Sequence, residues 1–152
     1  MQVTLRQGRN AMTENEIAAI ERACQRLIVS YCLMADHRQH EALADLWAED
    51  GTWDSAIGPL KGRADVRRYL DGKAVGPVTR HISSNAQIDV IDQNRATGTS
   101  YFTVYRADKQ AEKGPNPLTG PVLVGQYFDD FVRTKDGWKF AHRRMEFTFR
   151  AS

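Results

Sequence analysis

Residues 122–150, VLVGQYFDDFVRTKDGWKFAHRRMEFTFR, predict two β-strands joined by a tight turn. Asp136-Gly137 favours a hairpin turn, and apolar side chains alternate with polar ones on both sides of it. The alternation predicts strands at residues 122–134 and 138–150. We therefore expect the C-terminal part of the chain to form an antiparallel sheet.

The last predicted strand carries apolar side chains on both faces. Strict alternation directs Trp138 and Phe140 to one face, and Met145, Phe147 and Phe149 to the other. Helices can cover one face of the sheet, but a large apolar patch rarely stays in contact with water on the other. We therefore expect a homo-oligomer.

Helices are predicted ahead of this sheet. The first begins at the capping box Thr13-Glu-Asn-Glu16 and ends at a break over residues 35–37. The following elements are a helix over 38–48 that Gly51 ends, a strand over 52–57, a turn at Gly58-Pro59, a helix over 63–70, strands over 78–91 and 96–106, and a loop over 107–121. Helices followed by a run of antiparallel strands indicate an α+β fold.

Composition and charge are those of a globular domain. The 152 residues are 41% hydrophobic and 26% charged, and a net charge of +2 gives no reason to expect nucleic-acid binding.

We expect a polar tail over residues 1–12, with Met12 as an alternative start, and one domain over residues 13–150. No apolar run is long enough to span a membrane. Cys24 and Cys32 are too far apart along one helix to form a disulfide, so we expect free thiols and a cytoplasmic location.

Asp36 and His81 are candidates for acid–base catalysis. An imidazole suits a general base because its ordinary pKa lies near neutral pH, and a carboxylate such as Asp36 would orient the ring. Asp36 could instead cap the second helix, since aspartate is a favoured N-cap residue. Alternation groups His81 with polar residues such as Thr79, opposite Ile82 and Ile88, which also fits a solvent-exposed histidine.

Three further side chains could belong to a site. Arg143 shares a predicted strand face with apolar residues, where a charge needs a partner or a ligand; alternatively, it reaches water at the sheet edge. Tyr31 and Trp53 combine an apolar ring with a hydrogen-bond donor, so each could line a pocket or pack in the core.

Metal and cofactor signatures are absent from the sequence. The histidines and cysteines do not occur as HxH, HExxH or CxxC, and there is no GxSxG or phosphate-binding glycine loop. We therefore expect a site that uses no metal and no cofactor.

Five short motifs occur in an order that resembles the SnoaL-like branch of the NTF2-like superfamily. They are Tyr31-x4-Asp36, Leu43-x2-Leu-Trp-x3-Gly-x-Trp53, His81-x3-Asn85, Gly125-x-Tyr-x-Asp129 and Asp136-Gly-Trp-Lys-Phe-x-x-Arg143. Within this superfamily, the chain is most similar to scytalone dehydratase, bile-acid 7α-dehydratase and hexachlorocyclohexane dehydrochlorinase.

The resemblance implies a cone-shaped α+β barrel, in which a curved antiparallel sheet and the N-terminal helices enclose a pocket. It also implies a catalytic pair of Asp36 and His81, assisted by Tyr31 and Arg143. The substrate-binding residues that we predict on this basis are Trp53, Thr79, Asn85, Tyr127 and Met145. The resemblance favours a trimer over a dimer and implies no metal or organic cofactor.

Three functions are compatible with this sequence. The first is a cofactor-independent lyase, a dehydratase or a related β-elimination enzyme, that acts on a small hydrophobic cyclic substrate. The second is an isomerase or polyketide cyclase with the same Asp–His pair. The third is a non-catalytic ligand-binding or assembly subunit, whose pocket would be filled by core side chains. A fold alone does not decide between them.

Overall fold

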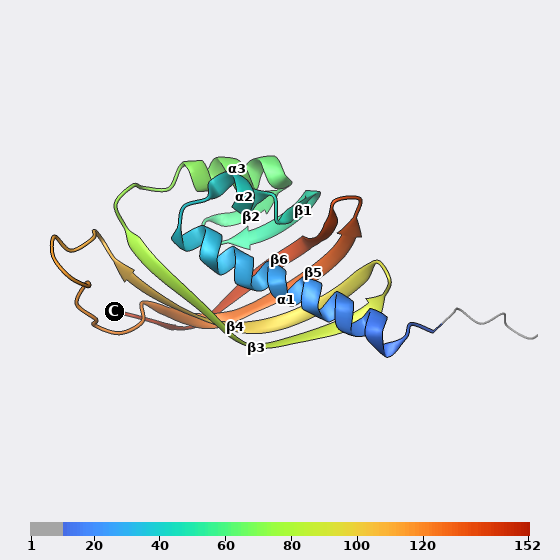
Figure 1. Ribbon diagram of the computed structural model, residues 1–152. Coiled ribbons are helices and arrows are strands. Elements are labelled where there is room, and N and C mark those ends of the chain that lie inside the picture. The colour runs from blue at the N-terminus through green and yellow to red at the C-terminus, as the bar shows by residue number, and fades with distance from the viewer. Residues whose placement is uncertain (1–10) are drawn as a thin grey trace, which may run out of the picture.

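A curved six-stranded sheet wraps around a long helix in the computed structural model, which describes residues 11–152 (Figure 1). The predicted tail over residues 1–12 lies outside the described residues as far as residue 10. The elements in chain order are α1 (Glu14–Asp36), α2 (His40–Ala44), β1 (Trp47–Ser55), β2 (Gly58–Lys61), α3 (Arg63–Asp71), β3 (Val78–Asp92), β4 (Arg95–Ala107), β5 (Leu123–Thr134) and β6 (Gly137–Arg150).

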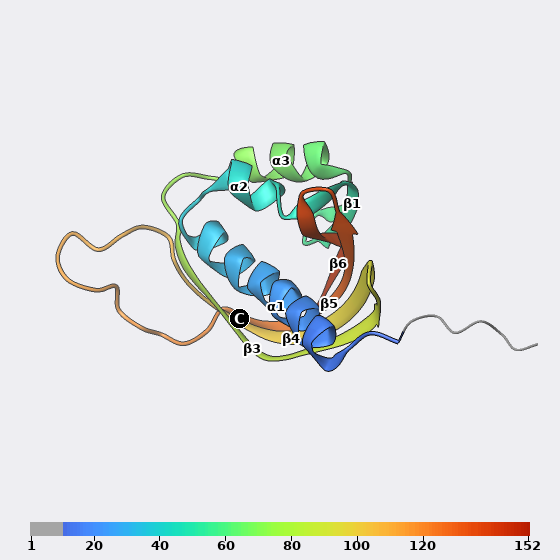
Figure 2. The same ribbon diagram turned by 45° about the vertical axis from the view of Figure 1, so that its right-hand side comes forward.

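The strands follow the order β2-β1-β6-β5-β4-β3 across the sheet. The four strands β3 to β6 form an antiparallel meander, as the sequence predicts, but β1 joins β6 in parallel. The sheet is therefore mixed rather than wholly antiparallel. Figure 2 shows α1 lying within the curve of the sheet, with α2 and α3 at one end beside β1. The predicted α+β architecture, with a curved sheet and N-terminal helices, is confirmed.

Helix α1 begins at the predicted capping box. The backbone N–H of Thr13 donates to the Glu16 carboxylate at 2.8 Å, and the Glu16 N–H donates to the Thr13 hydroxyl at 3.2 Å. The buried stripe of α1 includes Ile20, Cys24 and Tyr31, and packs toward the sheet. Because the helix continues to Asp36, that carboxylate lies on its last turn.

The second helix is shorter than predicted. It spans only His40–Ala44, and Trp47 already belongs to β1, where it pairs with Phe140 of β6. Gly51 therefore lies within a strand, and a Cβ there would lie 2.7 Å from the carbonyl oxygen of Phe140. Pairing with β6 overrides the helical spacing of this segment. Gly58-Pro59, expected as a turn, begins β2.

A bulge in β6 changes which side chains share a face. Ala141 is an extra residue relative to β5, so Phe140 and Arg143 both point to the concave side, whereas strict alternation separates them. A second extra residue, Thr148, turns Phe149 to the outer face, where it is 67% exposed. The predicted grouping of Phe149 with Met145 is therefore wrong.

A bulge in β3 has the same effect. One extra residue lies between Ser84 and Gln87, and Asn85 adopts a φ of 53° there. His81 and Ile88 consequently share the concave face, contrary to the expectation that they lie on opposite faces.

No helix among residues 11–152 is both long enough and apolar enough to cross a bilayer.

Candidate functional site

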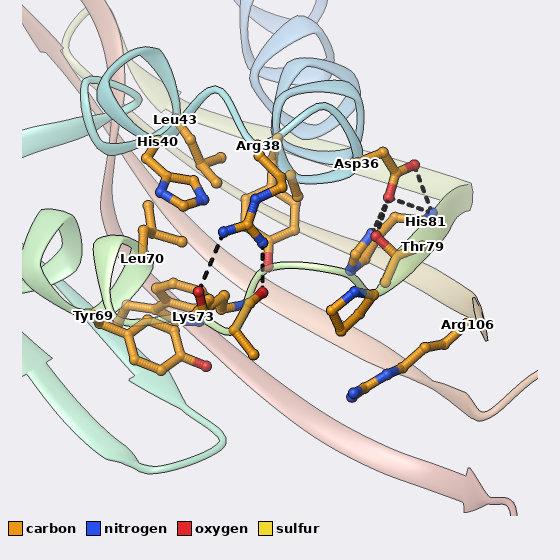
Figure 3. Close-up of a pocket in the computed structure, with 15 residues that line it drawn as sticks. Asp36, Arg38, His40, Leu43, Tyr69, Leu70, Lys73, Thr79, His81 and Arg106 are labelled. Atoms are coloured by element: carbon orange, nitrogen blue, oxygen red, sulfur yellow. Dashed lines mark hydrogen bonds and ion pairs between the residues drawn. The ribbon is translucent and has the colours of Figure 1, made fainter. Parts of the chain in front are cut away.

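A cavity of about 290 Å³ opens where the C-terminal end of α1 faces α3 and the beginning of β3 (Figure 3). Its inner wall is aromatic and includes Tyr31 and Trp53, which are both buried. Asp36 and His81 lie on one side of it. The remaining lining residues are Ala35, Arg38, His40, Leu43, Tyr69, Leu70, Lys73, Ala74, Pro77, Thr79 and Arg106.

Asp36 and His81 form a close pair in this cavity. The Nδ1 atom of His81 lies 2.6 Å from Oδ1 of Asp36. The side chain of Asp36 is 5% exposed, and that of His81 is 17% exposed. Because an ionised carboxylate only accepts hydrogen bonds, Nδ1 carries the proton of a neutral imidazole, and the lone pair lies on Nε2. Among residues 11–152, no side chain or backbone group hydrogen-bonds to Nε2.

The Asp36 carboxylate is held by three further hydrogen bonds. The Thr79 hydroxyl donates to Oδ1 at 2.9 Å, and the backbone N–H of His81 donates to Oδ2 at 2.9 Å and to Oδ1 at 3.2 Å. These donors come from β3, so they fix the end of α1 against the sheet. Asp36 does not cap α2, whose N-cap residue is Gln39. Thr79 and His81 are two residues apart on one strand, so alternation places both on the same face. Thr79 was predicted to bind substrate, and its hydroxyl binds Asp36.

Tyr31 lies between His81 and the aromatic core. Its ring centroid is 6.2 Å from the His81 ring and 5.9 Å from the Trp53 ring, in edge-on arrangements. Burial raises the pKa of Tyr31 to about 12. The phenol is therefore protonated across the physiological range and carries a hydrogen that it can donate.

Arg143 lies beneath this wall rather than in the cavity lining. Its guanidinium donates two hydrogen bonds to Asp129, at 2.7 and 2.8 Å, and both side chains are fully buried. Burial lowers the pKa of Arg143, but the charge of Asp129 and its hydrogen bonds outweigh that effect and raise the pKa overall. The guanidinium carbon lies 4.4 Å from the Tyr31 ring centroid and 4.0 Å from that of Tyr127. Arg143 thus supports Tyr31 from behind.

The five predicted substrate-binding residues are not brought together. Trp53 and Thr79 line the cavity, and Nε1 of Trp53 is buried without a hydrogen-bond partner in the described part of the chain. Tyr127 is buried behind Tyr31, and Met145 packs against the core. Asn85 is exposed at the bulge in β3. The structure therefore leaves Asn85, Tyr127 and Met145 out of the cavity wall.

Sequence reasoning missed the basic side of the cavity. No motif connects the basic residues that line the cavity, which lie in loops or near element ends; they are Arg38, Lys73 and Arg106.

Across residues 11–152, no group of three or more His, Cys, Asp or Glu side chains is arranged to hold a metal ion.

Fold and site together define a class: an α+β cone of the NTF2-like type with a carboxylate–imidazole pair at the wall of its pocket. Comparison with family models gives the family. Residues 16–144 match the SnoaL-like domain, and the chain belongs to this family.

Solved structures with the same fold carry enzyme names. A candidate scytalone dehydratase from Novosphingobium aromaticivorans DSM 12444 is 26% identical, with a TM-score of 0.76 over 91% of each chain. A hexachlorocyclohexane dehydrochlorinase from Novosphingobium barchaimii LL02 is 17% identical, with a TM-score of 0.73, over 91% of this chain and 93% of that one. At this identity, the second likeness concerns the fold alone.

A relative from Mycobacterium tuberculosis extends the family comparison. This uncharacterized protein of strain ATCC 25618 / H37Rv is 27% identical over 125 residues, which cover 78% of this chain and 79% of the relative.

Proposed function

We propose that the protein is a cofactor-independent lyase that eliminates water or a related leaving group from a small hydrophobic cyclic substrate. The observation that carries the proposal is the 2.6 Å contact between Asp36 and His81 at the cavity wall, with no hydrogen-bond partner for Nε2 of His81 in the described part of the chain. A general base needs a lone pair within reach of the substrate and a second group that holds the ring in place. The candidate scytalone dehydratase of the same fold supports the dehydratase form of this proposal.

In the proposed reaction, Nε2 of His81 removes a proton from a carbon of the bound substrate. The electron pair of the broken C–H bond forms a C=C bond, and the leaving group departs from the neighbouring carbon. A leaving hydroxide takes this proton from Nε2 and departs as water, which restores the base; a leaving halide departs as the anion, and Nε2 then gives its proton to solvent water. Asp36 stabilises the imidazolium that forms between these steps.

Tyr31 is the proposed hydrogen-bond donor to a substrate carbonyl or to the leaving group. A protonated phenol at the inner wall can stabilise negative charge that develops on an oxygen. Trp53 offers a second donor, since its buried Nε1 has no partner among residues 11–152. Arg143 and Asp129 act as positioning residues for Tyr31.

The same pair could also serve an isomerase or a cyclase, in which proton removal beside a carbonyl leads to no leaving group. Product analysis separates these reactions, because elimination releases water or halide and isomerisation releases nothing. The open cavity favours the two enzyme proposals over an assembly subunit, for which we expected side chains to fill the pocket.

The test is a panel of cyclic β-hydroxyketones and halogenated cyclohexanes, analysed for products by mass spectrometry. We expect His81→Ala to lower turnover of an accepted substrate by about 10²–10⁴-fold, the usual contribution of a general base. His37→Ala is the matched control, because His37 follows Asp36 but is exposed and does not line the cavity. Elimination that survives in His81→Ala, at the rate of the control, would overturn the proposal.

We further propose that the protein is a cytoplasmic homo-oligomer, with a trimer favoured over a dimer. Exposed apolar side chains on the sheet support association; they are Ile82, Tyr101 and Phe149. The free thiols of Cys24 and Cys32 suit a reducing compartment.

A further inference from the structure

The exposed end of the cavity is strongly basic. Lys73 and Arg106 both line it and are both exposed, and Arg38 lies between the catalytic pair and Lys73 (Figure 3). The only carboxylate among the described lining residues is Asp36, which is occupied by Thr79 and His81.

The charges of these cations are poorly compensated by the protein. Arg38 uses its two terminal nitrogens to donate to the carbonyl oxygens of Ala74 and Lys73, at 2.9 and 3.2 Å, and no carboxylate of residues 11–152 pairs with it. Arg106 has a loose contact of 3.7 Å with Asp108, whose side chain is 95% exposed.

Lys73 lies at the cavity, and no acidic side chain in the described part of the chain pairs with it. Its ammonium lies 5.0 Å from the Tyr69 ring centroid, and Tyr69 also lines the cavity. Partial desolvation of its ammonium against the cavity wall lowers the pKa of Lys73, and the charges of Arg38 and Arg106 lower it further. An arrangement that brings like charges together costs free energy unless an anion joins them.

We propose that the substrate carries an anionic group, such as a carboxylate, which Lys73 and Arg106 bind at the exposed end of the cavity. A guanidinium pairs with a carboxylate through two parallel N–H groups, and an ammonium adds a third charged donor. A concave site lined by charges of one sign also attracts an oppositely charged ligand from solution. The neutral ring of the substrate then extends inward, toward His81 and the aromatic wall.

This inference rests on the proposed function for the inner half of the site, because it treats the cavity as the substrate pocket. It narrows the substrate class from a hydrophobic ring to a cyclic acid. Arg38 has a different role, since its hydrogen bonds fix the segment that carries Lys73.

The test compares 2-naphthoate with 2-naphthamide, which have the same ring and differ in charge, by isothermal titration calorimetry. We expect the wild-type protein to bind the naphthoate roughly tenfold more tightly, the effect of a hydrogen bond to a charged group. Lys73→Gln and Arg106→Gln should each remove most of this preference and leave naphthamide binding unchanged. Lys135→Gln, in the turn after β5, is the control and should retain it. Added salt should weaken the binding of the naphthoate alone.

Equal affinities for the two probes in the wild-type protein would overturn the inference. The inference would also be overturned if the variants lose thermal stability but still prefer the naphthoate. Lys73 would then stabilise the C-terminal end of α3 without binding the ligand. The proposed function is tested separately. His81→Ala should keep the naphthoate preference, so loss of elimination without loss of charge selectivity distinguishes the two claims.

Discussion

At the scale of single residues, the Asp36 carboxylate organises the site. It joins the end of α1 to β3 through one hydroxyl, one backbone N–H and one imidazole. This network fixes the His81 ring at the cavity wall. The hydroxyl of Thr79 can be removed from this network with little change in the shape of the side chain.

Thr79→Val should therefore reduce catalysis without abolishing it. The Asp36 carboxylate loses one hydrogen-bond donor and keeps the bonds from His81, so we expect kcat to fall by roughly tenfold with little change in KM. Thr79→Ser restores the hydroxyl and should restore kcat. Steady-state kinetics measure the effect, and an unchanged kcat in Thr79→Val would contradict a positioning role for Thr79.

The buried phenol of Tyr31 should make stability depend on alkaline pH. Its pKa of about 12 in the folded protein exceeds the ordinary value, so folding favours the protonated form. That stabilisation is complete below about pH 10 and is lost as the pH rises toward 12. The difference between the two pKa values corresponds to about 2–3 kcal/mol of the free energy of unfolding.

Urea unfolding at pH 8 and pH 11 measures this dependence. Tyr31→Phe should show a smaller decrease in the free energy of unfolding than the wild-type protein, because phenylalanine does not ionise. Identical decreases in the two proteins would show that Tyr31 does not titrate with a raised pKa.

Some residues of the site could be predicted from the sequence, and others could not. Asp36, His81 and Tyr31 were found from motifs because each occurs at a characteristic place in the order of elements. The partner of Arg143 was harder to identify. Asp129 occurs in a quoted motif, but its pairing depends on the register of two strands that meet across a hairpin with a bulge.

At the scale of secondary structure, bulges explain most of the wrong predictions. Alternation is reliable until one extra residue enters a strand, and then every later side chain changes face. The extra residues in β3 and β6 fall beside Asn85 and at Ala141, where the sequence carries no glycine or proline to mark them. The parallel pairing of β1 with β6 also depends on distant residues, which the local helical pattern of residues 38–48 does not reveal.

Gly125 should be indispensable to the pairing of β5 with β6. A Cβ at this position would lie 2.1 Å from the carbonyl oxygen of Glu146 and 2.6 Å from Cζ of Phe102. We expect Gly125→Ala to lower the free energy of unfolding by about 2 kcal/mol or more, as overpacked cores do.

Gly72→Ala is the control, since the nearest atom to a Cβ there is the Arg68 carbonyl oxygen at 3.5 Å, an ordinary contact. It should change stability by no more than about 0.5 kcal/mol. Equal effects of the two substitutions in urea unfolding would mean that β6 can move away from Gly125.

At the scale of the whole molecule, five parts of the chain meet at the cavity. They are the end of α1, α2 with the segment before it, β1, α3 with its following loop, and the paired ends of β3 and β4. The sequence predicts the helices and the sheet, but not which residues line the cavity. The position of the cavity depends on how α2 and α3 close one end of the cone. For this reason the basic residues Arg38, Lys73 and Arg106 were not predicted.

The outer face of the sheet should mediate self-association. Tyr101 and Phe149 are 51% and 67% exposed on the described chain, and light scattering after gel filtration should give the mass of an oligomer, with a trimer favoured. Tyr101→Lys with Phe149→Glu should produce monomers. Leu118→Glu, in the loop between β4 and β5, is the control and should not. A monomeric wild-type protein would contradict this prediction.

The most direct test of the Asp36–His81 pair is a double-mutant cycle on kcat/KM for elimination. It uses Asp36→Asn, His81→Ala and the double variant, with His37→Ala as the control. If the two residues act as one unit, each single variant lowers kcat/KM to nearly the same residual rate, and the double variant loses little more. If the two losses add on the free-energy scale, Asp36 and His81 act independently, and the 2.6 Å contact is not a catalytic pair.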